Sequence, residues 1–356
     1  MRVLITGSSG QIGTNLALRL QREGHSVFGV DKRQNPWTDA FPTLLQDLAG
    51  HYPPFKGGIG GVEYPDVDIV VHLAAHAKVH QLVAQPHRAL ENQVMTFNVL
   101  EFCRGVRVPI VFSSTREVYG DVHRFEGYGE ATADFAFTES PYSASKIAAE
   151  ALIYSYARCY GLPYLVFRFS NVYGRYDNDL HRMVRVLPLF MHLMLGGERV
   201  TVFGRDKVLD FTYVDDCVNG IARGVQALVD GCVRNETINL AFGQGNTLFH
   251  AAELIAKQLD VEPRIDTAPA RLGEVTHYIA DIRKARDLLG WKPATSLDDG
   301  IPKAVTWFLE HRAAHPEEAA TIPSEGESVG WKATEPTTQL SSNGISLRAK
   351  SSDALA

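Results

Sequence analysis

A tyrosine and a lysine, Tyr142 and Lys146, stand four residues apart at the start of a predicted helix. Ser140 is a suitable N-cap for that helix, and Pro141 suits its first position. Residues at i and i+4 lie on one helix face, so the phenol and the ammonium can converge. A neighbouring ammonium favours the phenolate, so we expect the tyrosine pKa to fall below its usual value of about 10. The pair predicts a base that works near neutral pH, although such pairs are also common on solvated helix faces.

Three glycines, Gly7, Gly10 and Gly13, lie between an apolar run at 2–6 and a predicted helix at 12–23. Glycine is needed where a backbone turns tightly, approaches a pyrophosphate, or lets a helix pack on a strand. The helix N-terminus then presents N–H groups and the positive end of its dipole to phosphate. A plain tight turn also explains such glycines, but their place between a strand and a helix favours a dinucleotide cradle.

Asp31 ends the second predicted strand, 24 residues after Gly7. A carboxylate at this point accepts hydrogen bonds from ribose hydroxyls and repels a 2′-phosphate, which favours NAD over NADP. Lys32 and Arg33 follow directly and weaken that preference. An ordinary aspartate at a strand end is the alternative interpretation.

The composition argues against several classes of protein. A net charge of −6 over 356 residues does not suit a general nucleic-acid binder. The N-terminus has no signal-peptide pattern, and no apolar run approaches the roughly 20 residues of a membrane-spanning helix. The four cysteines are far apart, which indicates neither a disulfide framework nor a thiolate metal site. We therefore predict a cytoplasmic protein without a metal.

Apolar runs typical of buried parallel strands alternate with helical stretches along the chain. This alternation predicts an α/β fold, a doubly wound Rossmann sheet with helices on both faces. We expect a dinucleotide-binding domain at 1–172, to which later segments return, and a smaller lobe at 173–312. Residues 313–356 have no apolar period, which predicts a disordered tail. The predicted helices are 12–23, 92–103, 142–160, 183–195, 214–228 and 249–259.

Several blocks of residues, in order along roughly residues 1–310, resemble the extended short-chain dehydrogenase/reductase family in its nucleotide-sugar epimerase/dehydratase branch. Their number and order make chance an implausible explanation. The blocks are the glycine loop, Asp47–Leu48, His72–Ala75, Asn92 with Asn98–Glu101, Ser113–Gly120, Tyr142 with Lys146, Arg168–Gly174, Asp210–Asp216 and Arg271–Glu274.

The resemblance implies a catalytic triad of Thr115, Tyr142 and Lys146. In the family, the tyrosine takes a proton from a sugar hydroxyl while NAD takes hydride from the same carbon. The threonine bonds the reacting oxygen, and the lysine holds the nicotinamide ribose and the phenolate. The implied cofactor-binding residues are Gly7, Gly10, Gln11, Ile12, Gly13, Asp31, Lys32, Asp47, Leu48, Leu73, Ala74, Ala75, Asn92, Ser113, Tyr142 and Lys146.

On the substrate side, the resemblance implies a nucleotide sugar, and we expect it to be UDP-linked. Asn171 and Arg271 are expected at the diphosphate, where a planar guanidinium binds two oxygens. Phe203 is expected to pack on the base, and Glu274 to bond the ribose. The implied substrate residues are Thr115, Arg116, Glu117, Asn171, Arg175, Phe203, Arg271 and Glu274. The family also implies a homodimer built on the helices at 92–103 and 142–160.

The residue after Thr115 separates the reactions of this family. A 4,6-dehydratase has an aspartate there, but this chain has Arg116, which cannot supply a proton. Epimerisation needs only the triad and room for the sugar to rotate, so we favour an NAD-dependent 4-epimerase of a UDP-hexose or UDP-hexuronic acid. Arg116 suits a uronate carboxylate, although an exposed loop arginine is an equal alternative. Glu117 keeps an unusual dehydration open.

A later block also departs from the family pattern. Leu209 stands where an arginine is usual, which weakens the alternative of a UDP-glucuronate decarboxylase. It also leaves Arg205, Lys207 or Arg175 as substitutes at the diphosphate. A non-catalytic NAD-binding regulator is the second alternative, but the complete triad argues against it.

Overall fold

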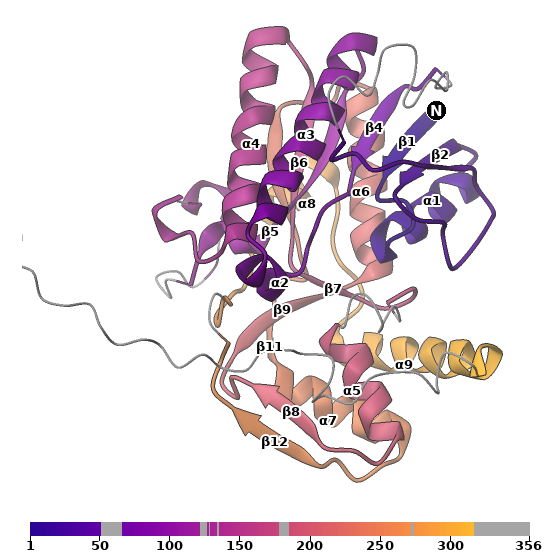
Figure 1. Ribbon diagram of the computed structural model, residues 1–356, viewed down its shortest axis with the longest axis vertical. Helices are drawn as coiled ribbons and strands as arrows, with labels where there is room; N and C mark the ends of the chain where they lie inside the picture. The colour runs from indigo at the N-terminus through magenta and orange to yellow at the C-terminus, as the bar shows by residue number, and fades with distance from the viewer. Residues whose placement is uncertain are drawn as a thin grey trace, which may run out of the picture.

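The structure is a computed structural model that describes residues 1–50, 66–121, 127, 129–133, 135–177, 185–271 and 274–316. These residues form two lobes that follow one another along the long axis of the molecule (Figure 1). Residues 317–356, which make up most of the predicted tail, lie outside the described residues.

The larger lobe is built on a seven-stranded sheet in which all neighbouring strands run parallel. The strand order is β10-β6-β5-β4-β1-β2-β3, so the chain winds outward in both directions from the centre. This is the predicted doubly wound sheet, and the crevice at its reversal point is where such folds bind ligands. The strands are β1 (Arg2–Thr6), β2 (Ser26–Asp31), β3 (Thr43–Leu45), β4 (Ile69–His72), β5 (Ile110–Thr115), β6 (Tyr164–Phe169) and β10 (Glu236–Leu240).

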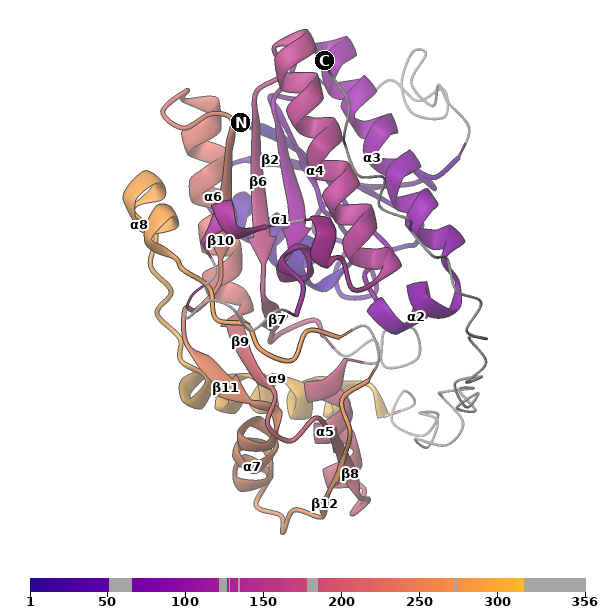
Figure 2. The ribbon, with the colours of Figure 1, turned by 90° about the vertical axis from the view of Figure 1, so that its left-hand side faces the viewer.

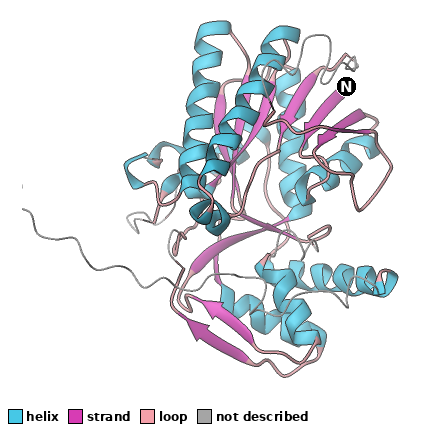
Figure 3. Cartoon of the chain, viewed as in Figure 1, coloured by secondary structure: helices cyan, strands magenta, loops and turns pink. Residues whose placement is uncertain are grey.

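Helices cover both faces of this sheet, which explains why its strands are apolar on both sides (Figures 2 and 3). Along β1, Val3 and Ile5 belong to one buried cluster and Leu4 to another, because successive side chains point to opposite faces. The first cluster includes residues of α1 (Gln11–Arg22), α6 (Val214–Val229) and α8 (Arg283–Leu289). The second includes residues of α3 (His87–Val106) and α4 (Pro141–Tyr160). The short α2 (Val79–Ala84) contacts α4 and α3.

The smaller lobe has its own buried cluster and two small sheets. One sheet has the order β11-β9-β7, and the other pairs β12 with β8. Helices α5, α7 and α9 complete the lobe, below the large sheet in Figure 1. The elements are β7 (Asn171–Tyr173), α5 (Val186–Leu195), β8 (Val200–Phe203), β9 (Val208–Tyr213), β11 (Gly245–Thr247), α7 (Leu248–Leu259), β12 (Ile265–Ala268) and α9 (Leu297–Ala314).

The chain crosses between the lobes repeatedly after residue 172. α6, β10 and α8 return to the large lobe, whereas α7 and α9 belong to the small one. Helix α9 was not predicted, and it runs to Ala314, past the boundary of 312 that the sequence suggested. No helix in the described ranges is long and apolar enough to cross a membrane.

The start of α4 follows the predicted pattern. Ser140 is its N-cap, with Pro141 at the first position, and Ser140 Oγ accepts from Ser143 N at 3.2 Å. Ser143 Oγ in turn accepts from Ser140 N at 3.0 Å, so the two serines form a reciprocal capping box. This cap fixes the first turn of α4, which carries Tyr142.

Candidate active site

The candidate site lies at the carboxyl end of β5, where the strand meets the first turns of α4. Thr115 is the last residue of β5, and a side-chain hydrogen bond joins it to Tyr142. Thr115 Oγ1 also accepts from Glu117 N at 3.3 Å, which caps the short helix η2 (Arg116–Tyr119). Both members of the Thr115–Tyr142 pair are buried. The strand end and the helix start therefore bring the two predicted hydroxyl groups together.

Lys146 is on the same face of α4 but faces the strand. Its Nζ donates to Ser113 O at 2.7 Å and lies 4.6 Å from the centre of the Phe112 ring. Burial lowers the pKa of Lys146 to about 7, and the negative charge of Glu150 opposes that shift. Lys146 thus reaches Ser113, one of the residues predicted to lie at the cofactor.

The pKa expected for Tyr142 was wrong in direction. Burial, with a smaller contribution from the nearby carboxylate of Glu117, raises the pKa of Tyr142 to about 12. The hydrogen bond from Thr115 and the charges of Arg185 and Arg116 oppose this increase. Spacing along a helix indicated the correct residues but carried no information on desolvation, which is the largest effect here.

The glycine loop has the geometry of a phosphate cradle. Gly7 has φ +73°, and a Cβ there would lie 2.7 Å from Ala74 N. A Cβ on Gly13 would lie 2.3 Å from Gly7 O, whereas Gly10 has only Gly7 O nearby, at 3.4 Å. Helix α1 begins at Gln11, directly after this loop. Gly7 and Gly13 are therefore required for close packing, and Gly10 borders open space.

Asp31 lies beside this loop, where the sequence predicted a ribose carboxylate. Its Oδ2 accepts from Ser9 N at 3.0 Å, and its Oδ1 accepts from Arg33 N at 3.2 Å. The Arg33 guanidinium turns back to donate to Ser9 O at 2.7 Å. Lys32, which was expected at the cofactor, lies near His76 beyond the end of β4, where burial and the Lys32 charge lower the pKa of the imidazole.

Two further predicted cofactor residues, Leu73 and Ala74, follow β4 at the same edge of the sheet. Leu73 N and Ala74 N both donate to Thr6, at the end of β1. Asn92 holds the loop after β4 by two hydrogen bonds to the backbone of His76, at 2.8 and 3.1 Å. Asn92 Nδ2 also lies 3.1 Å from Ser145 Oγ of α4, so its amide already has partners within the protein.

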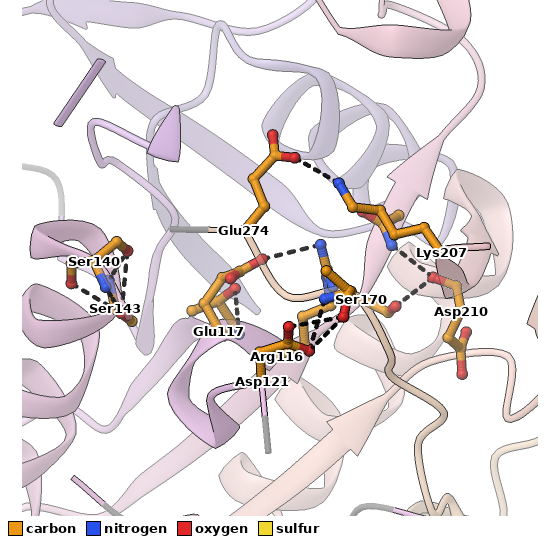
Figure 4. A network of polar contacts seen from close by, with 12 residues as sticks. Arg116, Glu117, Asp121, Ser140, Ser143, Ser170, Lys207, Asp210 and Glu274 are labelled. Atoms are coloured by element: carbon orange, nitrogen blue, oxygen red, sulfur yellow. Dashed lines mark hydrogen bonds and ion pairs between the residues drawn. The ribbon is translucent and has the colours of Figure 1, made fainter. Parts of the chain in front are cut away.

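Three predicted substrate residues, Arg116, Glu117 and Glu274, lie among other charged groups (Figure 4). The charges of Arg116 and Glu117 act on Tyr142. Arg116 Nη2 lies 3.0 Å from Glu117 Oε1, and both side chains are almost fully buried, 11% and 7% exposed. Lys207 Nζ lies 2.5 Å from Glu274 Oε2. Burial and the charge of Glu274 raise the pKa of Glu117, whereas the charges of Arg116 and Lys207 lower it, and burial is the largest effect. Arg116 Nη1 and Glu117 Oε2 are buried and have no hydrogen-bond partner among the residues that the structure describes.

Of the three proposed substitutes for the arginine missing at Leu209, only Lys207 lies in this group. Arg175 pairs with Asp215 of α6, and the Arg205 guanidinium lies 4.9 Å from the centre of the Phe249 ring. Leu209 itself is buried in the core of the small lobe.

The other predicted substrate residues have partners of their own. The Arg271 guanidinium lies 3.9 Å from the centre of the Phe203 ring, which covers one face of the ring expected to receive the base. Asn171 Nδ2 donates to Asp210 O at 3.1 Å.

Three residues near the site, Lys78, His80 and Arg185, were not predicted from the sequence. Burial and the charge of Arg271 lower the pKa of Lys78, and burial lowers that of His80 to about 4. Arg185 Nη1 donates to Gln11 Oε1, at the start of α1, at 2.9 Å. Lys78 and His80 directly follow the block that ended at Ala75, so their position was the available signal. Arg185 had no such signal.

Three histidines, His72, His76 and His80, share the four-residue spacing of helical metal ligands. They lie instead on the end of β4, on a loop and in α2. Within the described ranges, no three His, Cys, Asp or Glu side chains are grouped to hold a metal ion.

Comparison with known proteins now assigns the chain to a family. Residues 3–241 match the NAD dependent epimerase/dehydratase family. The chain belongs to that family. Its fold superposes on UDP-glucose 4-epimerase of Thermotoga maritima, solved with UDP-glucose, with a TM-score of 0.79 and 30% identity, covering 87% of this chain and 99% of that one. The NAD complex of UDP-glucose 4-epimerase from Thermus thermophilus gives a TM-score of 0.75 at 29% identity, covering 87% and 99%. UDP-glucuronic acid decarboxylase 1 of Xenopus tropicalis is 31% identical, over 88% of this chain and 74% of the relative.

Proposed function

We propose that this chain is an NAD-dependent 4-epimerase of a UDP-linked hexose or hexuronic acid, acting through a transient 4-keto sugar. The observation that carries the proposal is the hydrogen-bonded pair of Thr115 and Tyr142 at the end of β5, with Lys146 beside it. Arg116 occupies the position where a dehydratase needs a proton donor, which favours epimerisation.

The described residues fit a bound dinucleotide. The loop of Gly7, Gly10 and Gly13 with the N-terminus of α1 suits a pyrophosphate, and Asp31 suits the adenosine ribose. Bound NAD supplies the group that accepts a hydride from the sugar and returns it. We assign Lys146 and Ser113 to its second ribose, and Asn92 supports the loop after β4 through the backbone of His76.

The protein itself handles the proton. Tyr142 takes the proton of the sugar 4-hydroxyl and gives it back to the ketone oxygen after the sugar has rotated, so no net proton is consumed. Thr115 hydrogen-bonds the same oxygen. The charges of Arg116 and Arg185 favour ionised Tyr142, whereas the charge of Glu117 opposes it. Protonation of Glu117, whose pKa is raised by burial, therefore assists the base.

The diphosphate and nucleoside are assigned to the surface around Arg271. Lys78 and His80 lie close enough for the charge of Arg271 to act on both. Lys78 and Arg271 are the cations of this group and suit a diphosphate, whereas His80, with a pKa lowered to about 4, is a neutral hydrogen-bonding group there. We propose that Asn171 and Lys207 approach the same anion, that Glu274 binds a ribose hydroxyl, and that Arg271 with Phe203 forms the platform for the base. Arg175 is withdrawn from this set because Asp215 holds it.

Arg116 supports a uronic acid as one substrate. Its Nη1 is buried and has no partner within the described part of the chain, although Glu117 compensates its charge through Nη2. Turnover of UDP-glucose and UDP-glucuronate is to be compared in the wild type and in Arg116→Ala. If Arg116 contacts the carboxylate, its replacement lowers turnover of UDP-glucuronate more than turnover of UDP-glucose. An equal decrease for both sugars would rule out that contact.

Decarboxylation of UDP-glucuronate is the second candidate, favoured by the raised pKa of Glu117, which allows this carboxyl group to hold a proton. Product analysis separates the candidates. The purified protein is incubated, without added NAD, with UDP-, dTDP-, CDP- and GDP-sugars. An unchanged mass with altered proton couplings at C4 supports the epimerase. Loss of carbon dioxide supports the decarboxylase, and loss of water a dehydratase.

A non-catalytic NAD-binding regulator is tested by Tyr142→Phe. An enzyme loses turnover and retains NAD, whereas a regulator has no turnover to lose in either form. The cytoplasmic location stays a prediction from the sequence.

The homodimer is a proposal supported by exposed apolar residues on α3, where Leu90 and Val94 are 69% and 39% exposed one turn apart. Light scattering on the purified protein tests it, with Leu90→Asp and Val94→Asp expected to give monomers. A wild type that is already monomeric would remove the proposal.

A further inference from the structure

A buried ion pair between Glu150 of α4 and Arg168 of β6 lies next to the candidate site. Glu150 follows Lys146 by four residues on α4, on the same helix face, and is buried. Its carboxylate meets Arg168 of β6 in a bidentate pair, with Nε to Oε1 at 3.0 Å and Nη2 to Oε2 at 2.6 Å. It also accepts from Ser114 of β5 at 2.5 Å and from Tyr154 of α4 at 2.8 Å.

Ser114 stands between the two residues of β5 that the site uses. Ser113 O accepts from Lys146 Nζ at 2.7 Å, and Thr115 is hydrogen-bonded to Tyr142. The hydrogen bonds from Lys146 to Ser113 and from Ser114 to Glu150 therefore join consecutive residues of β5 to two consecutive turns of α4. A shift of the strand along the helix would break both bonds and move Thr115 relative to Tyr142.

The other side of the pair is also anchored. Arg168 Nη1 donates to Tyr119 Oη at 3.1 Å and to Glu130 O at 2.9 Å, and Tyr119 Oη donates to Asn239 Oδ1 at 2.7 Å. A buried ion pair contributes little net stability, because desolvation of the charges offsets their attraction. The pair matters here because, with the hydrogen bonds around it, it fixes one arrangement of β5, β6 and α4.

We propose that Glu150, held by Arg168, is a positioning residue that fixes the end of β5 against α4 through Ser114 and sets a carboxylate one helix turn from the Lys146 ammonium. The inference rests on the proposed function, in which Thr115 and Lys146 act on the sugar and its cofactor. Glu150 touches neither of these molecules, so its effect passes through the residues that it holds.

The charges around Lys146 support the second part of the proposal. Glu150 lies one turn further along its own helix, and His72 of β4 lies close enough for the charge of Lys146 to act on it. Arg168 of β6 pairs with Glu150. Burial lowers the pKa of His72 to about 3, so this imidazole is neutral in the physiological range. Among these groups only Glu150 raises the pKa of Lys146, which burial has lowered to about 7.

Glu150→Gln is the direct test, because it keeps the shape and removes the charge. The expected kcat is about 10-fold to 100-fold lower, as for other small displacements of catalytic groups, with a smaller change in KM. Since the cationic form of Lys146 is the active one, the alkaline limb of the kcat profile is expected to move to lower pH. The Cε resonance of ¹³C-labelled Lys146, assigned with Lys146→Arg, is expected to titrate at lower pH as well.

Ser114→Ala separates position from charge and also serves if Glu150→Gln fails to fold. It removes the link to β5 and leaves the ion pair, so kcat is expected to fall while the Lys146 titration is unchanged. Ser114→Thr restores the hydroxyl and is expected to recover kcat. Tyr154→Phe is the matched control, because it removes a bond to the same carboxylate without a link to β5, and it is expected to keep the wild-type kcat.

A wild-type kcat in Ser114→Ala would overturn the positioning role. An unchanged Lys146 titration in Glu150→Gln would overturn the electrostatic role. The titration is measured without a sugar, so it remains informative even if no nucleotide sugar is turned over and the proposed function fails.

Discussion

Tyr142 is surrounded by charged groups of both signs in a buried site, and their balance sets its proton affinity. Burial and Glu117 raise its pKa to about 12, while Arg185 and Arg116 act in the opposite direction. A base of this kind depends on its neighbours to work near neutral pH, because only its deprotonated form accepts a proton. Glu117 and Arg116, which are paired with each other, are thus expected to affect the rate in opposite ways.

Glu117→Gln is expected to move the acid limb of the kcat profile to lower pH. The reason is that removing a negative charge lowers the pKa of Tyr142, and the rate rises with pH as the tyrosine ionises. Arg116→Ala is the matched counterpart and is expected to move the same limb to higher pH. Profiles measured for both variants on one sugar check this prediction, and shifts in the same direction would contradict it.

At the residue scale, the sequence predicted the residues that meet in the site but gave the wrong direction for the pKa shift of Tyr142. The blocks around Thr115 and Tyr142 indicated a pair of hydroxyl groups, which the fold brings into hydrogen-bonding contact. The predicted decrease in the pKa of Tyr142 failed because Lys146 turns to Ser113 O and because burial cannot be seen in residue spacing. Arg271 over the Phe203 ring is likewise a contact between distant segments that no local pattern contains.

Among the elements, α9 shows most clearly how packing overrides local preference. Gly300 and Pro302 both lie inside this helix, and both disfavour helix by themselves. Gly300 is required because a Cβ there would lie 2.0 Å from Tyr173 Oη of β7. Most strands and helices of the large lobe were predicted from their apolar periods, but β10, α2 and α8 were not. Helix α9 was missed as well, because its sequence reflects a close contact with β7.

Gly300→Ala is expected to destabilise the protein by about 1–3 kcal/mol, since the added methyl group must displace Tyr173 or the helix. Urea unfolding at equilibrium measures this change. Gly105→Ala in α3 is the matched control, because a Cβ there meets nothing within 4 Å. It is expected to leave stability unchanged or to increase it by up to about 1 kcal/mol. Equal effects of the two substitutions would show that the contact with Tyr173 does not matter.

Across the whole molecule, an aromatic cluster joins the two lobes near the glycine loop. Trp37, in the loop after β2, lies with its ring centre 5.8 Å from that of Trp307 and 5.2 Å from that of His311, both on α9. Asn35 connects the same loop to the cradle, because its Nδ2 donates to Ser8 O at 3.2 Å. The order of sequence blocks predicted the two lobes, but the contact between residues so far apart in sequence was not predictable.

Trp307→Ala is expected to lower stability by about 2–4 kcal/mol, somewhat less than for a fully buried tryptophan, because its ring is only partly buried. The small lobe is also expected to unfold at a lower temperature than the sheet, so calorimetry should resolve a broader or divided transition. Leu309→Ala, on the same helix and 39% exposed, is the control and is expected to have little effect. A single sharp transition at the wild-type temperature in Trp307→Ala would contradict the role of the cluster.

The fate of the hydrogen at C4 tests the proposed reaction most directly. UDP-glucose carrying deuterium at C4 is incubated with the purified protein in ordinary water, and the product is examined by NMR and mass spectrometry. The account predicts UDP-galactose that retains the deuterium at C4, because the hydride removed from that carbon is returned to it. Replacement of the label by solvent hydrogen, or no product at C4 from any UDP-hexose or UDP-hexuronic acid, would contradict it.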